Sequence, residues 1–317
     1  MRSRIRTLVL QVAIVVAALA AGPSPDAAVP PRVAVVVSSN LGPFAEAVDA
    51  IRAALATSVV QPEILIFDLE GRQQKAADVI ALVRQANPSL IIPVGTLATA
   101  AVLAGPFTVP VVFTMVLYPA QSGFLSHPGR EVTGAALDIP LDAQFQTLRR
   151  LFPEARHIGV LYNPGETGRL IEAATAVLRR HGLTLEARQV DRAEVAPTVF
   201  EELLRDVDVV WSVADSHIFT PQNTSALILA AMRSRIPLFG LSVAHVRAGA
   251  LVALSCDYAD VGRQTAEIVL RVLQGEKASA LPPTSPRKVT LALNRRTARH
   301  LGLTIDPDLE REAEILQ

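Results

Sequence analysis

Residues 31–56 read PRVAVVVSSNLGPFAEAVDAIRAALA and contain the clearest strand-then-helix pattern of the chain. Val33 to Val37 has no polar interruption, which is typical of a strand buried on both faces of a parallel sheet. The amphipathic stretch from Pro43 to Ala56 follows and predicts a helix. A strand that leads into a helix is the first half of a β-α-β unit, so these residues favour a doubly wound parallel sheet.

The same alternation continues along the chain in two sets. The first set predicts strands at 63–67, 90–94 and 109–113, with helices at 72–85 and 97–103. After a pause at 114–130 and a short strand at 132–137, the second set predicts strands at 157–161, 185–190, 207–211, 237–240 and 251–254, with helices at 141–151, 168–181, 196–204 and 222–235. Two successive sets of about 110 residues predict an α/β protein with two Rossmann-like, doubly wound parallel-sheet lobes.

The C-terminal part of the chain predicts a return across the hinge between the lobes. Asp257 suits the N-cap of a helix that ends before Gly275, and Asp260 lies at the favourable end of its dipole. A proline-rich connection, a strand at 288–293 and a helix at 295–301 follow. The predicted division is a signal peptide and leader at 1–28, a first lobe at 29–138 plus about 256–275, and a second lobe at 139–255 plus about 276–317.

The N-terminal segment has the order of a secretory signal. Three arginines precede an apolar run from Leu8 to Ala21 that only Gln11 interrupts. About 14 residues fall short of the roughly 20 that span a bilayer, so a cleaved signal is favoured over a retained anchor. Cleavage after Ala20 and cleavage near Ala28 both fit. No cysteine stands directly after the run, so we expect a periplasmic protein without a lipid anchor.

Composition excludes several classes of protein. The 317 residues include 30 Lys and Arg against 30 Asp and Glu, and loss of the leader's three arginines leaves 27 basic residues. This balance removes the electrostatic basis for nucleic-acid binding. The single cysteine, Cys256, excludes an internal disulfide and multi-cysteine metal sites.

Candidate site residues follow from the topology, because ligands of open parallel sheets lie beyond the carboxyl ends of the strands. This rule selects twelve candidate ligand-binding residues: Ser38, Ser39, Asn40, Gly95, Thr96, Thr114, Tyr118, Asn163, Glu166, Asp215, Ser242 and Asp257. They offer hydroxyls, amides and carboxylates but no basic cluster. Such a site suits a small neutral or zwitterionic solute better than a polyphosphate.

Several candidates have a structural alternative. The hydroxyl residues also suit helix capping, which is compatible with binding. Asp215 is either a cap or the partner of a ligand cation, and Tyr118 either packs in its loop or stacks on a ligand. For Asp257 a capping role is favoured, and for Trp211 a place in the core.

Catalytic patterns are weak, and we expect no enzyme, no catalytic residue, no cofactor and no metal. The chain has no G-x-S-x-G elbow, no G-x-x-x-x-G-K phosphate loop and no H-E-x-x-H helix. Its six histidines show no spacing typical of metal ligands. Cys256 has no basic neighbour that would lower its pKa, so it is expected to act as a small buried hydrophobic residue.

Seven stretches together carry a family resemblance. They are IIPVGTLATAA at 91–101, VPVVFTMV at 109–116, GREVTGAALDIP at 129–140, IGVLYNPGE at 158–166, RIPLFGLSVAHVRAGALVAL at 235–254, DYADVGRQTAEIVLRVLQGE at 257–276 and LNRRTARHLGL at 293–303. With them the chain resembles the substrate-binding proteins of ATP-binding cassette transporters with a type I periplasmic-binding fold, in a branch that includes tryptophan and tyrosine binders. The resemblance implies two lobes, joined by three crossings, that close on a solute and deliver it to a membrane permease.

The resemblance also assigns residues to the family's site. It matches Thr96 to a Gly-Thr loop, Asn163 and Glu166 to a Tyr-Asn-Pro-x-Glu loop, Asp215 to the second lobe's acid, and Asp257 with Tyr258 to an Asp-Tyr helix start. Departures fall at the same site. Tyr118-Pro119 replaces the usual Asp-Pro, and Thr167-Gly168 replaces Asn-Ser.

Three functional hypotheses follow. The leading one is a solute receptor for transport, whose partners are a small-molecule ligand and the permease. For an amino acid, Thr96 and nearby amides would hold the carboxylate, Asp215 or Glu166 the ammonium group, and Tyr118 would flank the side chain. A sensory module of the same fold that reports to a membrane partner is the alternative, and an enzyme is disfavoured.

Overall fold

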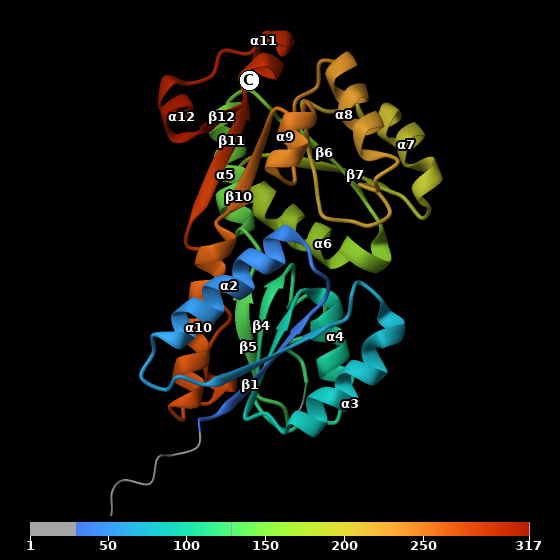
Figure 1. Ribbon diagram of the computed structural model, residues 1–317. Helices are drawn as coiled ribbons and strands as arrows, with labels where there is room; N and C mark the ends of the chain where they lie inside the picture. Colours follow the sequence, from blue (N-terminus) through green and yellow to red (C-terminus); the bar gives the residue numbers. More distant parts are fainter. Residues whose placement is uncertain (1–29, 128, 317) are drawn as a thin grey trace, which may run out of the picture.

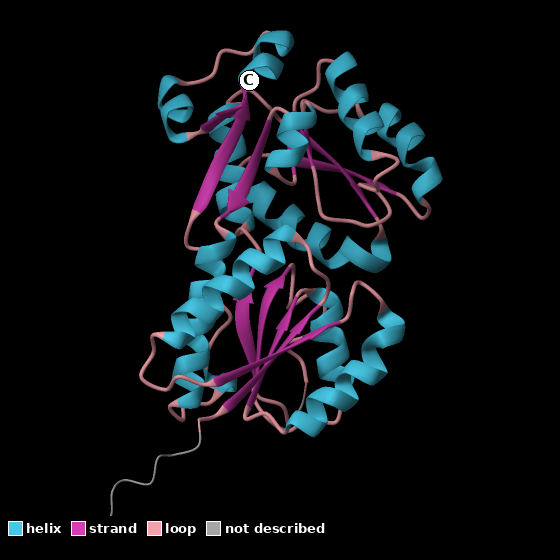
Figure 2. Cartoon of the chain, viewed as in Figure 1, coloured by secondary structure: helices cyan, strands magenta, loops and turns pink. Residues whose placement is uncertain are grey.

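The computed structural model describes residues 30–127 and 129–316, and the predicted signal peptide and leader at 1–28 lie outside these residues. The chain forms two sheets in separate halves of the molecule, each flanked by helices (Figure 1, Figure 2). The first sheet has the strand order β2-β1-β3-β4-β5, and all its pairings are parallel. Its strands are β1 (Arg32–Val37), β2 (Glu63–Asp68), β3 (Leu90–Val94), β4 (Val111–Val116) and β5 (Val132–Ala136).

Helices cover both faces of the first sheet. They are α2 (Gly42–Ala56), α3 (Ala76–Ala86), α4 (Thr96–Ala104) and, from the far end of the chain, α10 (Tyr258–Leu273), with short 3-10 turns η1 (Gln73–Lys75) and η3 (Ala278–Ala280). Alternate residues of β1 enter two cores. Val33 and Val35 pack with α2 and α10, whereas Ala34 and Val36 pack with α3 and α4. The uninterrupted apolar run is therefore explained by burial on both faces.

The second sheet has the order β12-β11-β10-β9-β8-β6-β7, with β10 and β11 antiparallel and the other pairs parallel. Its strands are β6 (His157–Tyr162), β7 (Thr184–Gln189), β8 (Val209–Trp211), β9 (Leu238–Gly240), β10 (Val252–Cys256), β11 (Val289–Asn294) and β12 (Glu314–Leu316). Its helical segments are α5 (Leu141–Leu151), α6 (Pro164–Arg180), η2 (Ala193–Val195), α7 (Ala196–Leu203), α8 (Thr224–Arg233), α9 (Val243–Ala248), α11 (Arg295–Leu301) and α12 (Pro307–Glu312). Both halves consist mainly of parallel strands that alternate with helices, as predicted.

The chain crosses between the sheets three times, after β5, after β10 and before β11. The second crossing carries α10 back to the first sheet, where Val261 and Val269 join the core that α2 covers. Residues 278–284 also pack on this sheet, because Ala278 and Leu281 enter the same core and Thr284 forms a bridge with Ala135. The sequence-based division had placed residues from about 276 onward in the second lobe.

Some element boundaries differ from those predicted. Helix α6 begins at Pro164 rather than 168, because Asn163 caps it and proline is compatible with the first helical position. Strand β4 extends to Val116 through a bulge at Met115, so Thr114 lies within a strand and not in a loop. The short elements α9, α12 and β12 were not predicted. The expected cap of α10 is confirmed, since the Asp257 side chain accepts a hydrogen bond from the Asp260 amide.

Within the part of the chain that is described, no helix combines the length and apolarity needed to cross a bilayer.

Candidate ligand-binding cleft

A cleft lies at the carboxyl ends of the strands, between the two sheets, and it has two adjoining compartments. The inner compartment has a volume of about 160 Å³ and is lined by β5–α5 crossing residues, by the ends of β8, β9 and β10, and by Tyr258. The outer compartment has a volume of about 420 Å³ and is lined by Thr96, Ser122, Glu166 and Phe219, among others. Leu117, Tyr118, Ala214 and Leu241 line both compartments.

The wall between the compartments is a strained turn that carries Tyr118. Its backbone φ is +52°, a left-handed conformation that a residue with a β-carbon adopts at a cost. The Tyr118 amide donates to the Asp138 carboxylate, and the Leu137 amide donates to the Val116 carbonyl at 2.8 Å. These bonds hold the turn against the first crossing. The Tyr118 ring packs against the core of the second sheet, so this one residue joins the two halves.

Asp138 is the one formally charged residue among those that line the inner compartment. Burial raises the pKa of its carboxyl group to about 6, although the bond from the Tyr118 amide acts in the opposite direction. Burial also raises the pKa of the Cys256 thiol to about 11, so this neighbouring group stays neutral. The compartment therefore combines apolar walls with a single titratable acid.

Ser212 contributes a second polar group to the same compartment. It follows β8, and its residue is 5% exposed. Its hydroxyl is the one buried side-chain polar atom in 30–127 and 129–316 that has no hydrogen-bond partner. An unsatisfied buried hydroxyl costs about 1–3 kcal/mol.

The buried residue Trp211 is hydrogen-bonded to Gln144, which lines the compartment. Its indole N–H donates to Gln144 Oε1 at 2.8 Å, and Gln144 Nε2 donates to the Ile139 carbonyl at 2.7 Å. The Trp211 ring also meets Phe145 edge-on, with 5.0 Å between centroids. The predicted core position of Trp211 is confirmed. Its hydrogen bonds connect β8 to the first crossing and so position Asp138.

Thr96 begins α4 and lines the outer compartment. Gly95 precedes it with φ of +87°, and a β-carbon there would lie 2.7 Å from Ser38 Oγ. Only glycine fits this tight approach. The positive end of a nine-residue helix thus points to the cleft, a position that favours a carboxylate.

Asp215 does not present its carboxylate to the cleft. Its side chain has no exposed surface. Oδ2 accepts from the Asn163 amide at 2.7 Å and from the Thr167 hydroxyl at 2.6 Å, and Oδ1 accepts from the His217 amide at 3.0 Å. These bonds hold the start of α6 against the segment after β8. Of the two readings of Asp215, the structural one therefore fits its contacts.

Glu166 faces the outer compartment but already has partners. Its carboxylate accepts from the Ser216 amide at 3.0 and 3.1 Å and from the Ser216 hydroxyl at 2.7 Å, and His217 Nδ1 lies 3.3 Å away. Atoms of Glu166, Asp215 and His217 lie within 4.8 Å of one another, which is metal-ligand spacing. Hydrogen bonds from the protein to both carboxylates account for this cluster without an ion.

The structure brings four of the twelve predicted residues to the cleft, namely Thr96, Tyr118, Glu166 and Asp215. The other eight do not line either compartment: Ser38, Ser39, Asn40, Gly95, Thr114, Asn163, Ser242 and Asp257. Hydrogen bonds within the protein explain most of these positions. The buried Ser38 hydroxyl donates to the Val94 carbonyl and accepts from the Ala98 amide, and the buried Thr114 hydroxyl accepts from Thr265.

Capping accounts for three more of these residues. Asn163, Ser242 and Asp257 each accept a hydrogen bond from an amide in the first turn of the helix that follows.

Sequence reasoning missed Asp138 and Ser212. Both could have been found by the same topological rule, since Ser212 directly follows β8 and Asp138 lies two residues beyond β5.

Two α/β halves, three crossings and a cleft at the strand ends define a type I periplasmic-binding fold. Residues 32–316 match the family described as ABC transporter substrate binding protein. The chain belongs to this family, whose members are binding proteins.

Known relatives agree with this class. A tyrosine-binding protein of Clostridioides difficile (strain R20291) is 22% identical over 200 residues, which are 62% of this chain and 57% of that protein. A conserved domain protein from Vibrio cholerae has a TM-score of 0.71 at 23% identity, covering 91% of this chain and 100% of its own.

Two further solved structures share the fold. The ABC domain in complex with L-Trp from Streptococcus pneumonia has a TM-score of 0.71 at 22% identity, over 90% of this chain and 99% of its own. The ligand-free, open structure of a substrate-binding protein with adhesive properties from Clostridium difficile has a TM-score of 0.76 at 17% identity, with the same coverage.

Proposed function

We propose that this protein captures one small solute in its cleft, outside the cytoplasm, and delivers it unchanged to the permease of an ATP-binding cassette transporter. The observation that carries the proposal is the outer compartment, because residues of both sheets line it. Thr96 comes from the first half, whereas Glu166 and Phe219 come from the second. A solute held there contacts both halves and stabilises their closed arrangement.

Contact across the cleft supports this mechanism. Arg169 on α6 donates a hydrogen bond of 3.4 Å to the Gln121 carbonyl. Gln121 belongs to the loop after β4. Both groups are exposed at the cleft edge. An exposed contact of this kind is weak, so a bound solute adds to the packing of Tyr118 on the second sheet in stabilising the closed arrangement. Micromolar affinity corresponds to about 8 kcal/mol.

We propose amino acids, aromatic ones first, as the ligand class. One relative is a tyrosine-binding protein, and another has been solved in complex with L-Trp. In this chain Thr96 and the start of α4 suit a carboxylate, and Tyr118 offers a ring to flank a side chain. A signal peptide at 1–28 would direct the chain to the periplasm.

The test is a thermal-shift screen of the chain without residues 1–28 against amino acids, purines, sugars and small acids. A compound that binds only the folded protein raises the midpoint of unfolding at saturation. The same compound should lower the radius of gyration in solution scattering, because the lobes close on it. If no class of compound raises the midpoint, the proposal of solute capture fails.

A further inference from the structure

Two polar groups of the inner compartment lack partners from the protein. The Ser212 hydroxyl is buried and unpaired. Asp138 Oδ1 accepts from the Tyr118 amide, whereas Oδ2 has no hydrogen-bond donor in the described ranges 30–127 and 129–316. Both residues line one small cavity. The unpaired Ser212 hydroxyl lowers stability, and a ligand that supplies a partner recovers it, whereas the Asp138 carboxyl group is partly exposed and open to a ligand from the cavity.

The charge of the cavity lining favours a positively charged group on the ligand. No Lys, Arg or His lines the inner compartment, as far as the chain is described, and its walls include Leu117, Leu241 and Tyr258. Between apolar walls, a carboxylate without a counter-ion attracts a cation more strongly than it would in water. A Ser hydroxyl adds an acceptor for a second N–H.

The other acids near the cleft and the hinge have partners already. Asp215 is enclosed by bonds from three groups, and Glu166 accepts from Ser216. Asp257 and Asp260 lie within 4 Å of the cations of Arg263 and Lys288. Among these acids, Asp138 is the one whose carboxylate keeps an oxygen without a donor, and its residue lines the inner compartment.

We propose that Asp138 and Ser212 form the subsite for a protonated amine, so that the ligand is a primary ammonium compound with an apolar body. This deepens the proposed function and rests on it. The ammonium group lies in the inner compartment, the apolar body passes Tyr118, and a carboxylate, where the ligand has one, lies toward Thr96. The sequence-based assignment of the ammonium group to Asp215 or Glu166 is replaced.

The test uses a fixed set of probes: L-tyrosine, L-tryptophan, tyramine, tryptamine, and the deaminated acids 3-(4-hydroxyphenyl)propanoate and indole-3-propanoate. We expect at least one amine of this set to raise the unfolding midpoint, and its deaminated counterpart to bind about 10- to 100-fold more weakly, which is the effect of losing a hydrogen bond to a charged group. Titration calorimetry on the best amine then compares variants.

Asp138→Asn should weaken binding of that amine by about 10- to 100-fold. Asparagine keeps an oxygen for the Tyr118 amide, so the turn is preserved. Ser212→Ala should weaken binding by about 3- to 10-fold without lowering the unfolding midpoint of the free protein, because the hydroxyl has no partner to lose. Glu172→Gln, which removes an exposed acid of α6, is the matched control for charge and should bind normally.

The pH dependence separates binding from a structural role. Tyr118, Cys256 and Tyr258 share the cavity with Asp138 and have pKa values raised by burial, so Asp138 is the one group lining this cavity that titrates between pH 5 and 8. His245, which contacts Leu241 from behind the cavity, has its pKa lowered by burial. Affinity of the wild type for the amine should fall as the pH drops below about 6, and that of Asp138→Asn should stay constant.

Two results overturn the inference. One is equal binding of the amine by the wild type and Asp138→Asn. The other is that no amine of the set binds. Sugars, purines or acids without an amine that bind in the wider screen would still support solute capture, so the two proposals fail separately.

Discussion

At the residue scale, Tyr118 and Asp138 form a coupled pair whose local energetics are unfavourable. Tyr118 adopts a positive φ, and Asp138 holds a carboxyl group in a partly desolvated cavity. Costs of this kind persist where function requires them. They are measurable in the protein without ligand.

Asp138→Asn should stabilise the free protein, and more so at high pH. The folded pKa of about 6 lies above the usual value of 3.8, so the folded state favours the protonated acid. The contribution of the protonated carboxyl group to the stability of the wild type is complete below about pH 4 and is lost as the pH rises through 6. The difference in free energy of unfolding between the variant and the wild type should therefore rise by about 2–3 kcal/mol, in favour of the variant, from pH 4 to pH 8. Urea unfolding of both proteins at pH 4 and pH 8 measures this, and an unchanged difference between the two pH values would contradict it.

Sequence reasoning at this scale identified residue types correctly but not their contacts. Asp215 and Asp138 are both acids near a strand end. One is enclosed by donors from the start of α6, and the other keeps an oxygen free. That difference depends on which segments the fold brings together, so no local pattern contains it.

At the element scale, α10 connects the C-terminal part of the chain to the first sheet by close packing on α2. Both helices lie side by side (Figure 1). At Gly262 a β-carbon would lie 2.3 Å from the Ala47 carbonyl oxygen and 2.9 Å from the Ala50 β-carbon. Only a residue without a β-carbon allows this approach. The apolar face of α10 was predicted from spacing, but the need for glycine at this contact was not.

Gly262→Ala should therefore lower the free energy of unfolding by about 1–3 kcal/mol, because overpacking against a backbone outweighs the helix propensity of alanine. Gly168→Ala is the matched control within α6. Its β-carbon would meet nothing closer than the Pro164 β-carbon at 4.0 Å, so it should raise stability by about 0.5–1 kcal/mol. Urea unfolding of the two variants should give shifts of opposite sign. Shifts of the same sign would refute the close contact.

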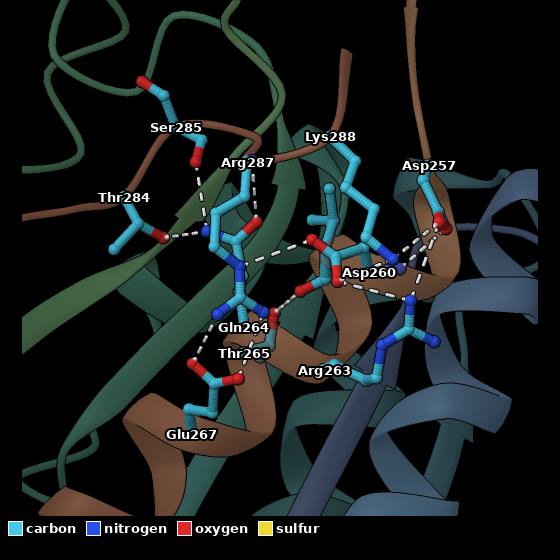
Figure 3. Close-up of polar contacts among 11 residues, drawn as sticks. Asp257, Asp260, Arg263, Gln264, Thr265, Glu267, Thr284, Ser285, Arg287 and Lys288 are labelled. Carbon is cyan, nitrogen blue, oxygen red and sulfur yellow. Dashed lines mark hydrogen bonds and ion pairs between the residues drawn. The ribbon is translucent and has the colours of Figure 1, made fainter. Parts of the chain in front are cut away.

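At the scale of the whole molecule, an ion cluster holds the third crossing against α10 (Figure 3). The buried carboxylate of Asp260 lies 3.3 Å from Arg263, 3.4 Å from Arg287 and 3.8 Å from Lys288. Arg287 also forms two bonds to Glu267, at 3.0 and 3.1 Å. Arg287 and Lys288 lead into β11, so the cluster joins a helix of the first half to a strand of the second.

Asp260→Asn should destabilise the protein by about 1–3 kcal/mol at pH 7, because three cations lose their shared partner. Burial alone would raise the pKa of Asp260, but Arg287 and the neighbouring cations lower it below its usual value. The stabilisation is therefore present above about pH 4 and is lost as the pH falls through the folded pKa. Urea unfolding at pH 7 and pH 3.5 should show the difference from wild type shrinking at the lower pH.

Glu267→Gln is the control for this cluster. Its side chain is 59% exposed, so loss of its ion pair should cost less than about 1 kcal/mol. Equal losses in the two variants would show that burial of Asp260 contributes nothing.

Local sequence patterns were sufficient to predict the alternation of strands and helices, the two-lobed architecture and the Asp257 cap of α10, because these depend on residues close together in the chain. Which polar groups reach the cleft depends on contacts between distant parts of the chain. Asp138 and Ser212 come from different halves, and their unpaired atoms become evident only when the contacts of the described chain are known. Hydrogen-bond satisfaction is a non-local property, whereas periodicity and capping are local.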